Sequence, residues 1–595
     1  MREAVLRDAD DGRWLSFIEP TRVVVARRLE EVVSALEEVD LAVENDLLTA
    51  VGFLAYEAAP AFDPAFRTRR PEGDLPLLCF GLFESGVRTS GPESSRSGSF
   101  TIGEWRATES EAAHGRAVER IRDHIARGDT YQVNHTFRLR APFEGDPKGL
   151  FRDLVRCQPE SYAAYLDLGD RVVCSASPEL FFRLEGDRLL SKPMKGTARR
   201  GWSLESDRAQ ERRLAESEKD RAENAMIVDM VRNDVGRVAR SGTVEVTRRF
   251  EVERHPTVFQ MTSTVEARTD ASVAEIMAAA FPFASVTGAP KIRTMELITQ
   301  LESDPRGIYT GAIGVIRPGR RARFSVGIRT AVVGRASKTV EYGVGSGIVW
   351  DSAAGDEYRE CVAKAAILSR STPDFDLLET MLWEPDTGFS LLERHLGRLA
   401  GAAGFFDRGI DEDRIRSDLE TRAEGFDHAR HRVRLLVAAD GSHRIEAGAL
   451  ETESVTAPVR LGLAADPVKR EDPFLHFKTT NRGIYDRARA SRPDCDDVLL
   501  WNEEGEVTES TIANLVAKVA GELVTPPVGC GLLAGTFREE LLVRAEIVDR
   551  VIRVEELSRA ESLFLVNSVQ GLREVEWSPQ QGISGFDNDD PGGEI

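Results

Sequence analysis

The sequence predicts a mixed protein of class α+β or α/β, arranged in two parts. Short runs of β-branched and apolar residues alternate with stretches of helical periodicity along the whole chain. A helical pattern ending in ECVAKAAIL is followed by SRSTPDFD at residues 369–376, where Pro373 cannot continue a helix. We therefore divide the chain near residue 371 into parts of 1–370 and 371–577, with a polar, glycine-rich tail at 578–595.

The expected elements follow from local composition and periodicity. Strands are expected where β-branched and aromatic residues cluster, and helices where apolar residues recur at helical spacing. In the first part the expected strands are 171–175, 243–246, 324–328 and 339–344, and the expected helices are 211–238, 273–281 and 356–369. In the second part RVRLLV at 432–437 and DVLLW at 497–501 are expected to be strands.

Composition excludes several function classes. Of the 595 residues, 78 are Lys or Arg and 99 are Asp or Glu, and the formal net charge of −21 argues against a nucleic-acid or anionic-membrane partner. The longest apolar stretch, around residues 276–286, is too short to span a bilayer. The opening MREAVLRDADDGRW lacks the apolar core of a secretory signal. The six cysteines form no CxxC pair, so a reduced, cytoplasmic protein is expected.

Two pairs of carboxylates stand three residues apart on expected helices. Asp220 and Glu223 belong to the helix at 211–238, and Glu357 and Glu360 belong to the one at 356–369. Residues at i and i+3 share a helix face. The pairs are either solvated surface charges or part of a Mg²⁺ site, in which one or two carboxylates act with waters and an anionic ligand. The apolar residues after Glu360 favour the second interpretation.

Small-residue segments accompany these helices. Lys195 precedes a glycine in KPMKGT, where backbone can approach a ligand closely, and Glu179 ends SASPE. VTGAPK at 286–291 lacks the Gly-Lys-Ser/Thr of a phosphate-binding loop. YGVGSGIV at 342–349 continues as a strand-like IVW, whereas a dinucleotide fingerprint requires a helix there.

Taken in order, these segments resemble the motifs of chorismate-utilising enzymes. The match consists of GDTYQVN (128–134), SPE (177–179), PMKGT (193–197), AENAMIVDMVRND (222–234), TGAPK (287–291), GIVWDS (347–352) and ECVAKA (360–365). It covers about residues 110–370, which we expect to be the catalytic core, and the preceding residues resemble the family's N-terminal region. The resemblance implies a large α/β sandwich that binds chorismate.

Two positions separate the activities within that family. Gln132 stands where isochorismate and salicylate synthases have a lysine that activates water. Lys195 stands where aminodeoxychorismate synthases have lysine and anthranilate synthases usually have alanine. The resemblance therefore implies amination of chorismate to 4-amino-4-deoxychorismate, and an anthranilate synthase component remains the alternative.

The same resemblance implies roles for individual residues. Lys195 would attack C2 of chorismate as a nucleophile, and Glu179 would protonate the departing C4 hydroxyl as a general acid. The Mg²⁺ ligands would be Glu223 and Glu360, supported by Asp220 and Glu357, and the substrate contacts would be Gln132, Gly196, Thr197, Thr287, Tyr309, Arg329, Gly345, Gly347 and Lys364.

The first part departs from the family pattern at two places. Gln260 stands where many relatives have histidine, and PFAS at 282–285 replaces the commoner Pro-Gly-Gly-Ser. These departures concern local substrate contacts and leave the expected reaction class unchanged.

The second part contains a lysine followed by an acid and a glycine-rich turn. Lys478 ends an aromatic cluster, FLHFK, and Glu509 follows in GEVTESTIANL. GLLAGTFR at 531–538 is a glycine turn that opens a helix, which is a plausible phosphate cradle. An enzyme that uses pyridoxal 5′-phosphate (PLP) needs these three features: a Schiff-base lysine, a partner for the pyridine nitrogen and a phosphate site.

Together with ERHLGRL at 393–399, this pattern resembles fold-type-IV PLP enzymes, which are α+β proteins and include aminotransferases and aminodeoxychorismate lyase. By the resemblance Lys478 carries the PLP and Glu509 pairs with its pyridine nitrogen. The phosphate contacts would be Arg398, Thr511, Ile512, Thr536 and Phe537. The usual first strands are missing, because the second part opens abruptly at DFDLLET, so its site is either completed by the neighbouring part or weakened.

The combination implies a bifunctional enzyme. A lyase fused to the enzyme that makes its substrate would yield 4-aminobenzoate and pyruvate from chorismate, a step toward folate. The alternatives are an anthranilate synthase component fused to a class IV aminotransferase, and an active synthase with a non-catalytic second part. Nothing resembles a glutamine amidotransferase, so ammonia is expected from a separate subunit of that kind or from solution. A homodimer through the PLP-type part stays open.

Overall fold

A computed structural model of the chain describes residues 1–8, 12–70, 73–89, 91–92, 98–159, 161–365, 368, 374–427, 429–450 and 459–579. The chain forms two compact units. The first unit consists of Met1–Arg199 and Gln210–Thr372, and the second consists of Arg200–Ala209 and Pro373–Ile595. All but the first two residues of the predicted tail at 578–595 lie outside the described residues.

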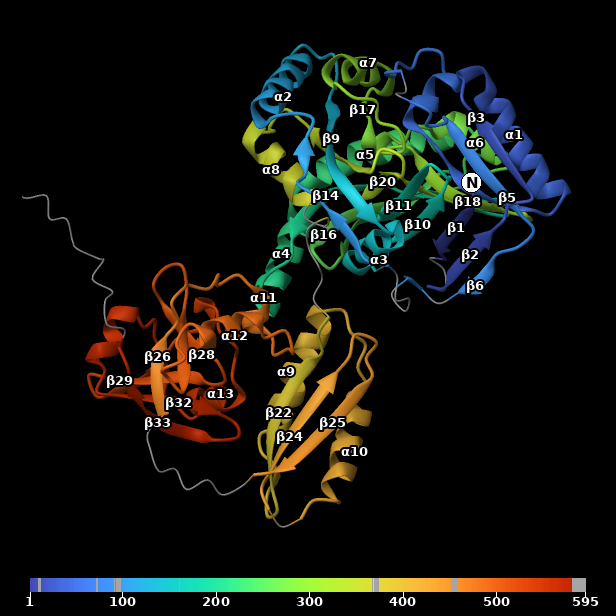
Figure 1. The fold of residues 1–595 in the computed structure, drawn as a ribbon. Coiled ribbons are helices and arrows are strands. Elements are labelled where there is room, and N and C mark those ends of the chain that lie inside the picture. The colour runs from blue at the N-terminus through green and yellow to red at the C-terminus, as the bar shows by residue number, and fades with distance from the viewer. Residues whose placement is uncertain are drawn as a thin grey trace, which may run out of the picture. The chain divides into compact units, whose positions relative to one another are not determined.

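Two large sheets form the first unit (Figure 1). The first sheet has the order β17 (Gly288–Ala289), β9 (Gln132–Gly145), β21 (Thr339–Ile348), β20 (Thr330–Gly334), β11 (Arg171–Ser177), β10 (Tyr162–Asp167), β1 (Glu3–Arg7), β2 (Trp14–Ile18) and β6 (Val87–Thr89), with β7 (Phe100–Ile102) and β8 (Arg106–Ala107) paired to β9. The second has the order β14 (Met194–Arg199), β16 (Val258–Arg268), β13 (Arg188–Lys192), β12 (Leu180–Glu185), β19 (Arg321–Val326), β18 (Ala312–Arg317), β4 (Thr49–Leu54), β5 (Leu78–Phe83) and β3 (Arg22–Ala26), with β15 (Glu245–Arg254) paired to β16.

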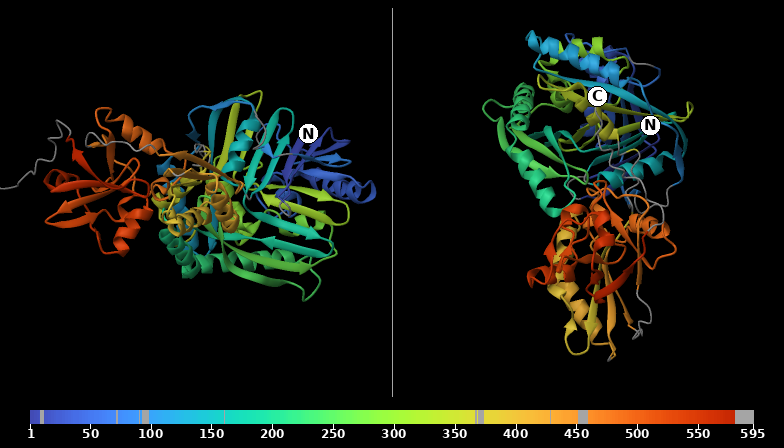
Figure 2. Two further views of the ribbon diagram at one scale, coloured as in Figure 1. Left: turned by 90° about the horizontal axis from the view of Figure 1, so that it is seen from below. Right: turned by 90° about the vertical axis from the view of Figure 1, so that its left-hand side faces the viewer.

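The two sheets pack face to face. Successive strand residues point to opposite faces, so Val51 and Phe53 of β4 join a core shared with Leu166 of β10 and Val173 of β11, whereas Leu54 faces the helices outside the second sheet. Helices α1 (Leu29–Asn45), α5 (Glu218–Gly236) and α6 (Val273–Ala280) cover that outer face, and α3 (Pro147–Cys157) and α8 (Ala354–Ala365) cover the first sheet. The layered helices and strands can be followed from two further directions in Figure 2. This arrangement confirms the predicted α/β sandwich.

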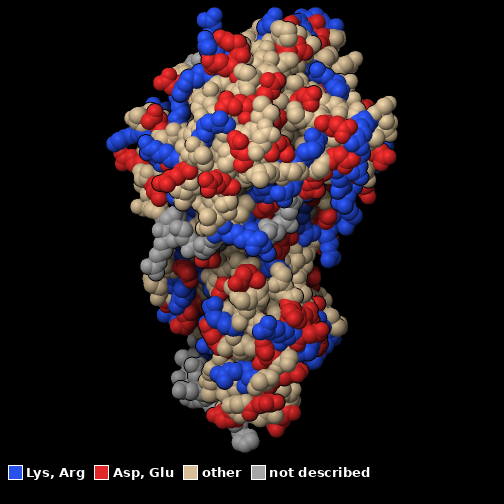
Figure 3. Space-filling model, turned by 90° about the vertical axis from the view of Figure 1, so that its right-hand side faces the viewer, with Lys and Arg blue, Asp and Glu red and all other residues tan. Residues whose placement is uncertain are grey.

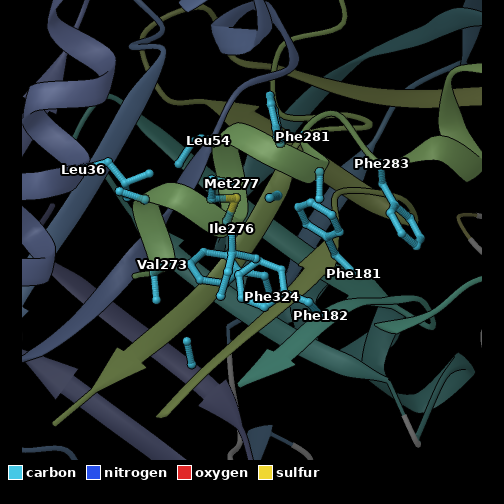
Figure 4. Packing of buried hydrophobic residues seen from close by; sticks show 14 of the residues in the cluster. Leu36, Leu54, Phe181, Phe182, Val273, Ile276, Met277, Phe281, Phe283 and Phe324 are labelled. Carbon is cyan, nitrogen blue, oxygen red and sulfur yellow. The ribbon is translucent and has the colours of Figure 1, made fainter. Parts of the chain in front are cut away.

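Aromatic packing fixes α6 to the second sheet. Figure 4 shows Phe181 and Phe182 of β12 and Phe324 of β19 beside Ile276 and Met277 of α6. The rings of Phe182 and Phe324 lie 5.1 Å apart between centroids. Burying such side chains supplies most of the free energy that holds a helix on a sheet, at about 1.5–3 kcal/mol per large side chain.

The predicted helix at 211–238 is wrong, because the chain forms two helices there, α4 (Leu204–Glu216) and α5. Ser217 interrupts the run, and its side chain accepts a hydrogen bond from the backbone N–H of Asp220 at 3.2 Å. A serine N-cap satisfies one of the N–H groups that a helix start leaves unpaired. As a result Asp220 and Glu223 belong to the first two turns of α5.

The other predicted elements of the first unit are confirmed with small shifts of their ends. The strands at 171–175, 324–328 and 339–344 correspond to β11, β19 and β21, the strand at 243–246 starts two residues later as β15, and the helix at 273–281 is α6. The helix at 356–369 starts at Ala354, and its predicted end lies largely outside the described residues. The described part of this unit also contains helices α2 (Glu111–Ala126) and α7 (Lys291–Leu301) and 3₁₀ turns at Tyr56–Ala61 and Ala284–Val286.

The second unit holds two smaller sheets. One has the order β23 (Gly388–Phe389), β22 (Leu377–Glu384), β24 (His431–Val437) and β25 (His443–Ala449), with helices α9 (Leu392–Phe405) and α10 (Glu412–Ala423). The other has the order β28 (Val507–Ser510), β27 (Asp497–Trp501), β26 (Val459–Leu463), β33 (Gly571–Trp577), β32 (Ser562–Asn567), β29 (Asn514–Val519), β30 (Glu522–Thr525) and β31 (Val548–Asp549), with α11 (Pro473–His476), α12 (Gly483–Ala490), α13 (Thr536–Val543) and 3₁₀ turns at Val528–Cys530 and Val554–Arg559. The predicted strands at 432–437 and 497–501 are confirmed as β24 and β27, and the unit is α+β as predicted.

Surface character agrees with the composition. On the face drawn in Figure 3, basic and acidic side chains are interspersed, so that face offers no broad field of one sign. Among the helices of the described residues, none combines the length and apolarity that crossing a lipid bilayer requires.

A buried ion pair joins three segments of the first unit. The guanidinium of Arg306 donates to both carboxylate oxygens of Glu302, at 3.0 and 2.6 Å, and to the carbonyls of Val286 and Asn134, each at 2.7 Å. Both charged side chains are almost fully buried. Arg306 therefore fixes the start of β9 against the segment that leads into β17.

Replacing Glu302 with Gln should destabilise the protein by about 3–5 kcal/mol, because the Arg306 charge would stay buried without its counter-ion. Glu296→Gln on α7, the helix that ends just before Glu302, is the matched control, since its partner Arg293 is 38% exposed and such surface pairs contribute at most about 1 kcal/mol. Urea unfolding of both variants measures the difference. Equal midpoints would show that the buried pair contributes no more than the exposed one.

Candidate active sites

The start of β9 lies between two strands of small residues. Antiparallel pairing places Gly347 of β21 opposite Asn134 and places Ala289 of β17 opposite Gln132. Because residue 347 is a glycine, other side chains can occupy the space that a Cβ would fill. The register thus brings three separate sequence motifs, GDTYQVN, TGAPK and GIVWDS, to one edge of the first sheet.

Lys195 approaches this edge from β14 at the end of the second sheet. A Cβ atom added to Gly347 would lie 2.4 Å from Nζ of Lys195 and 3.0 Å from Nε2 of Gln132. Nζ of Lys195 also pairs with Oε2 of Glu223 on α5 at 3.2 Å, and both side chains are less than one-fifth exposed. The structure therefore brings the predicted nucleophile, one predicted metal ligand and two predicted substrate contacts into one cluster.

Gln132 presents a buried amide to this cluster. Its side chain is fully buried, and within the described residues neither Nε2 nor Oε1 has a hydrogen-bond partner. Leaving a buried polar group unpaired costs about 1–3 kcal/mol. An amide kept in this state is available to a polar ligand that binds beside Lys195.

Glu179 is buried between β11 and β12, with its carboxylate turned toward β14. Its Oε1 accepts the backbone N–H of Met194 at 3.3 Å. Burial is the main cause that raises the pKa of this carboxyl to about 7, while a nearby serine, the Met194 N–H and the Lys195 charge act in the opposite direction. Glu179 can therefore carry a proton near neutral pH, as a general acid must.

The predicted metal carboxylates converge on Lys195 from two helices. Glu360 of α8 pairs with Nζ of Lys364 at 2.6 Å. The Glu360 side chain is 48% exposed. Partial desolvation opposes its ionisation, but the Lys364 and Lys195 charges hold its pKa below the usual range. Glu223 and Glu360 thus both lie within reach of the Lys195 charge. Asp220 is close too, because a Cβ added to Gly196, which has φ of +98°, would lie 3.0 Å from its Cβ.

These residues fit a Mg²⁺ ion that the protein coordinates together with water and substrate. They do not fit one that protein side chains enclose on all sides. Among the described residues no three His, Cys, Asp or Glu side chains form a group that could hold a metal ion. Mg²⁺ commonly uses one or two protein carboxylates and fills its other positions with waters and an anionic substrate. The donor set of Glu223 and Glu360 agrees with that mode.

The remaining predicted substrate contacts fall into two groups. Arg329 donates to the Lys364 carbonyl, and Nζ of Lys364 donates to the Gly345 carbonyl at 2.9 Å, so these three residues join α8 to β21. Within the described residues no hydrogen bond links Thr287 or Tyr309 to another predicted site residue. The Thr287 hydroxyl instead bonds two carbonyls of the preceding turn, and the Tyr309 ring packs under a buried arginine and against β21.

Two residues without a predicted role form hydrogen bonds to strand β14 at Lys195 and its neighbours. Asn224 of α5 donates to the Lys195 carbonyl at 3.2 Å, and its own Oδ1 accepts the Ser263 hydroxyl at 2.6 Å. Gln260, noted above only as a departure from the family pattern, donates to the Gly196 carbonyl at 2.7 Å and accepts the Thr197 hydroxyl at 3.0 Å. Asn224 stands inside a quoted motif, but nothing in its spacing indicated this contact.

The second unit places Lys478 directly after α11. Its backbone carbonyl accepts the N–H of Leu378 on β22 at 3.0 Å. Burial, helped by the Arg398 charge, lowers the pKa of the Lys478 amine to about 8. A larger neutral fraction near physiological pH is what an amine needs to form a Schiff base.

Glu509 faces the same interior space. Its Oε1 accepts the Tyr485 hydroxyl at 2.8 Å and the Leu533 N–H at 3.1 Å, and its Oε2 accepts Nδ2 of Asn514 at 3.1 Å. Burial raises the pKa of Glu509 to about 7, and Lys478 is among the charges that act on it. A buried carboxyl held by three donors near Lys478 fits the partner that the pyridine nitrogen of PLP requires.

The predicted phosphate contacts come from two places. Thr536 and Phe537 begin α13, where the first N–H groups of a helix have no partner within the helix, and Nη1 of Arg398 donates to the Ala534 carbonyl just before them at 3.0 Å. Thr511 and Ile512 differ, since the Thr511 hydroxyl and N–H both bond Asp497, and the Ile512 side chain is 58% exposed. We name the group of Arg398, Ala534, Gly535, Thr536 and Phe537 the phosphate cradle.

Gly347→Ala should reduce chorismate turnover by roughly 100-fold, because the new methyl group would displace Lys195 and Gln132 by about 1 Å. Gly236→Ala is the matched control, since no atom lies within 4 Å of the methyl it would add. Steady-state turnover and thermal melting measure activity and folding separately. Full activity of Gly347→Ala would contradict the close approach.

Amination should fall as pH rises through about 7, because Glu179 then loses the proton it must donate. Glu179→Gln should remove this limb and lower the rate by about 10²–10⁴-fold. The measurement is chorismate consumption against pH at constant unprotonated ammonia. Asp40→Asn is the control, since burial raises the pKa of Asp40 to about 6 while its carboxylate bonds Ser272 and the Ala274 N–H at the start of α6. A profile that rises through pH 7 in the unmodified protein would contradict the role.

Comparison with known proteins supports the predicted resemblances. The family model described as chorismate binding enzyme matches residues 2–370, and the model described as amino-transferase class IV matches residues 376–576. Both matches confirm the two families expected from the motifs.

Individual relatives are similar over part of their length. Aminodeoxychorismate synthase of Streptomyces griseus is 44% identical over 256 residues, which cover 42% of this chain and 35% of that protein. Anthranilate synthase component 1 of Aquifex aeolicus is 37% identical over 269 residues, which cover 45% of this chain and 54% of that protein. The chain thus spans between about a third and a half of the length of these relatives.

A solved structure supports the fold of the first unit. Anthranilate synthase component I from Streptococcus pneumoniae superposes with a TM-score of 0.53 and 24% identity over 62% of this chain and 92% of that one. At this identity the likeness concerns the fold alone.

Proposed function

The chain belongs to the chorismate binding enzyme family, and we propose that it converts chorismate into 4-aminobenzoate in two steps, one in each unit. The first step is amination of chorismate to 4-amino-4-deoxychorismate. The second is PLP-dependent elimination of pyruvate. We place the boundary between the activities near residue 371 and assign no activity to the tail at 578–595.

The single observation that carries the first step is the position of the Lys195 amine, beside the Glu223 carboxylate, the unpaired Gln132 amide and the glycine at 347. A lysine at this position is typical of the aminodeoxychorismate synthases that the motif resembles, whereas anthranilate synthases usually have alanine. A chorismate ring bound there would lie against the Lys195 amine, the proposed nucleophile, and beside the Gln132 amide.

The proposed chemistry balances with the residues present. Lys195 first gives a proton to water, and its neutral amine adds at C2 while Glu179 donates its proton to the C4 hydroxyl, which leaves as water. Ammonia then adds at C4 and the bond from C2 to Lys195 breaks, which releases the neutral amine to take its proton back from water. The proton released by ammonia restores Glu179. Mg²⁺ held by Glu223 and Glu360 would neutralise a carboxylate of the substrate.

The second step uses Lys478, which is partly buried, and the buried carboxyl of Glu509. Bound PLP supplies an electron sink for the carbanion that deprotonation at C4 creates. Lys478 removes that C4 proton, and its pKa of about 8 leaves part of the amine neutral near pH 7. Loss of the enolpyruvyl group as pyruvate then aromatises the ring to 4-aminobenzoate, a folate precursor.

We assign the ammonia supply to a separate glutamine amidotransferase subunit. All six cysteines of the chain are buried, so none offers an accessible nucleophile for glutamine hydrolysis. A homodimer through the second unit is a further proposal, which sedimentation of the full chain would test.

A second candidate function is anthranilate synthesis coupled to a class IV aminotransferase. The 37% identity to the Aquifex aeolicus protein, named anthranilate synthase component 1, favours it. The two functions give different products from the same substrates, so one product analysis separates them.

Lys478→Ala should leave chorismate consumption intact and make 4-amino-4-deoxychorismate accumulate, because the second step loses its base and its PLP anchor. Pyruvate and 4-aminobenzoate should fall at least 100-fold. Chromatography of products from chorismate, Mg²⁺, ammonia and PLP gives the result. The exposed Lys469→Ala is the matched control and should behave as the unmodified protein.

Three outcomes would count against the proposal. Equal 4-aminobenzoate from Lys478→Ala would remove the lyase assignment. Anthranilate from the unmodified protein would favour the second candidate, and an unmodified protein that takes up no PLP would favour a non-catalytic second unit.

A further inference from the structure

Glu379 connects the side chains of Arg398 and His395 in the interior of the second unit. It lies on β22, is 2% exposed, and accepts Nε and Nη2 of Arg398 at 2.9 and 2.6 Å. It also accepts Nδ1 of His395 at 2.7 Å. Burial disfavours the carboxylate, but Arg398 and His395 hold the pKa of Glu379 down to about 2, so the side chain is ionised.

His395 extends the hydrogen-bonded chain from Glu379 to Thr536, which belongs to the phosphate cradle. Its ring is fully buried, and Nε2 lies 3.2 Å from the Thr536 hydroxyl. With the Nδ1 proton directed at the Glu379 carboxylate, Nε2 is left to accept the Thr536 hydroxyl. Thr536 is the first residue of α13, where the backbone N–H groups have no partner within the helix.

Arg398 and the backbone at Gly535, two other parts of the phosphate cradle, are held in place by their contacts. Arg398 uses three N–H bonds on Glu379 and the Ala534 carbonyl, and the guanidinium keeps further N–H bonds for an anion. The backbone at Gly535 is confined, because an added Cβ would lie 1.9 Å from Oδ1 of Asn514. The distance between Arg398 and the start of α13 therefore depends on Glu379 and His395, which join them through hydrogen bonds.

We propose that Glu379 and His395 are positioning residues that hold Arg398 and the start of α13 at the separation needed to bind the phosphate of PLP. The proposal rests on the assignment of PLP to this unit in the proposed function. Neither residue touches the reacting atoms: Glu379 acts through Arg398, and His395 acts through Thr536. A merely structural pair would stabilise the unit without any preference for phosphorylated ligands.

The test compares two ligands that differ only in the phosphate group, PLP and pyridoxal, on the full-length chain. His395→Phe keeps the ring and removes both hydrogen bonds, and Glu379→Gln keeps the shape and removes the charge. Each should weaken PLP binding about 10-fold or more, as the loss of one charge-assisted contact implies, while pyridoxal binding changes less than about twofold. Absorbance titration gives both dissociation constants.

Two controls accompany these variants. His431→Phe replaces another buried histidine, which stacks on Phe426 and bonds a backbone carbonyl instead of the cradle, and it should leave the PLP constant unchanged. Inorganic phosphate should compete with PLP in the unmodified protein and compete less well in both test variants. Thermal melting shows that each variant is folded.

The outcomes separate this inference from the proposed function. Equal losses for PLP and pyridoxal, or unchanged PLP binding in both variants, would overturn the positioning role. Normal, phosphate-dependent PLP binding without any 4-aminobenzoate would overturn the lyase assignment and leave the inference intact. An unmodified protein that binds neither ligand would overturn both.

Discussion

The chemistry of the first unit depends on where β9 begins. Gln132 and Asn134 lie between β17 and β21, and the buried guanidinium of Arg306 bonds carbonyls on either side of that junction. Because β-strand register has a period of two, a shift by one residue would turn the Gln132 amide away from Lys195. The Arg306–Glu302 ion pair and the register of β9 thus define the sheet edge where GDTYQVN, TGAPK and GIVWDS meet. Lys195 of PMKGT approaches the same edge.

Two partly buried lysines lie at the centres of the two candidate sites. Nζ of Lys195 pairs with a carboxylate oxygen of Glu223 at 3.2 Å. For Lys478, desolvation and then the Arg398 charge lower the pKa of the amine to about 8. The same side chain thus stands beside a carboxylate in the first unit, whereas in the second unit desolvation favours its neutral form.

Much of the fold followed from local patterns, and much of the site did not. Short runs of β-branched and apolar residues predicted β11, β21, β24 and β27, because such side chains favour strands. The division of the helix at Ser217 was missed, since the apolar periodicity continues across the serine and only its cap bond reveals the break. Motif order indicated Lys195 and Lys478. Contacts such as Arg306 with Asn134, or His395 with Thr536, join residues more than a hundred positions apart, and no local spacing reports them.

The central claim is that Lys195 forms a bond to the substrate during amination. Intact-protein mass spectrometry of the chain incubated with chorismate and Mg²⁺, but without ammonia, tests it most directly. We predict an adduct equal to chorismate less one water, which peptide mapping places on Lys195 and which ammonia discharges. A protein that turns over chorismate with ammonia yet shows no such adduct, or carries it on another residue, would contradict the claim.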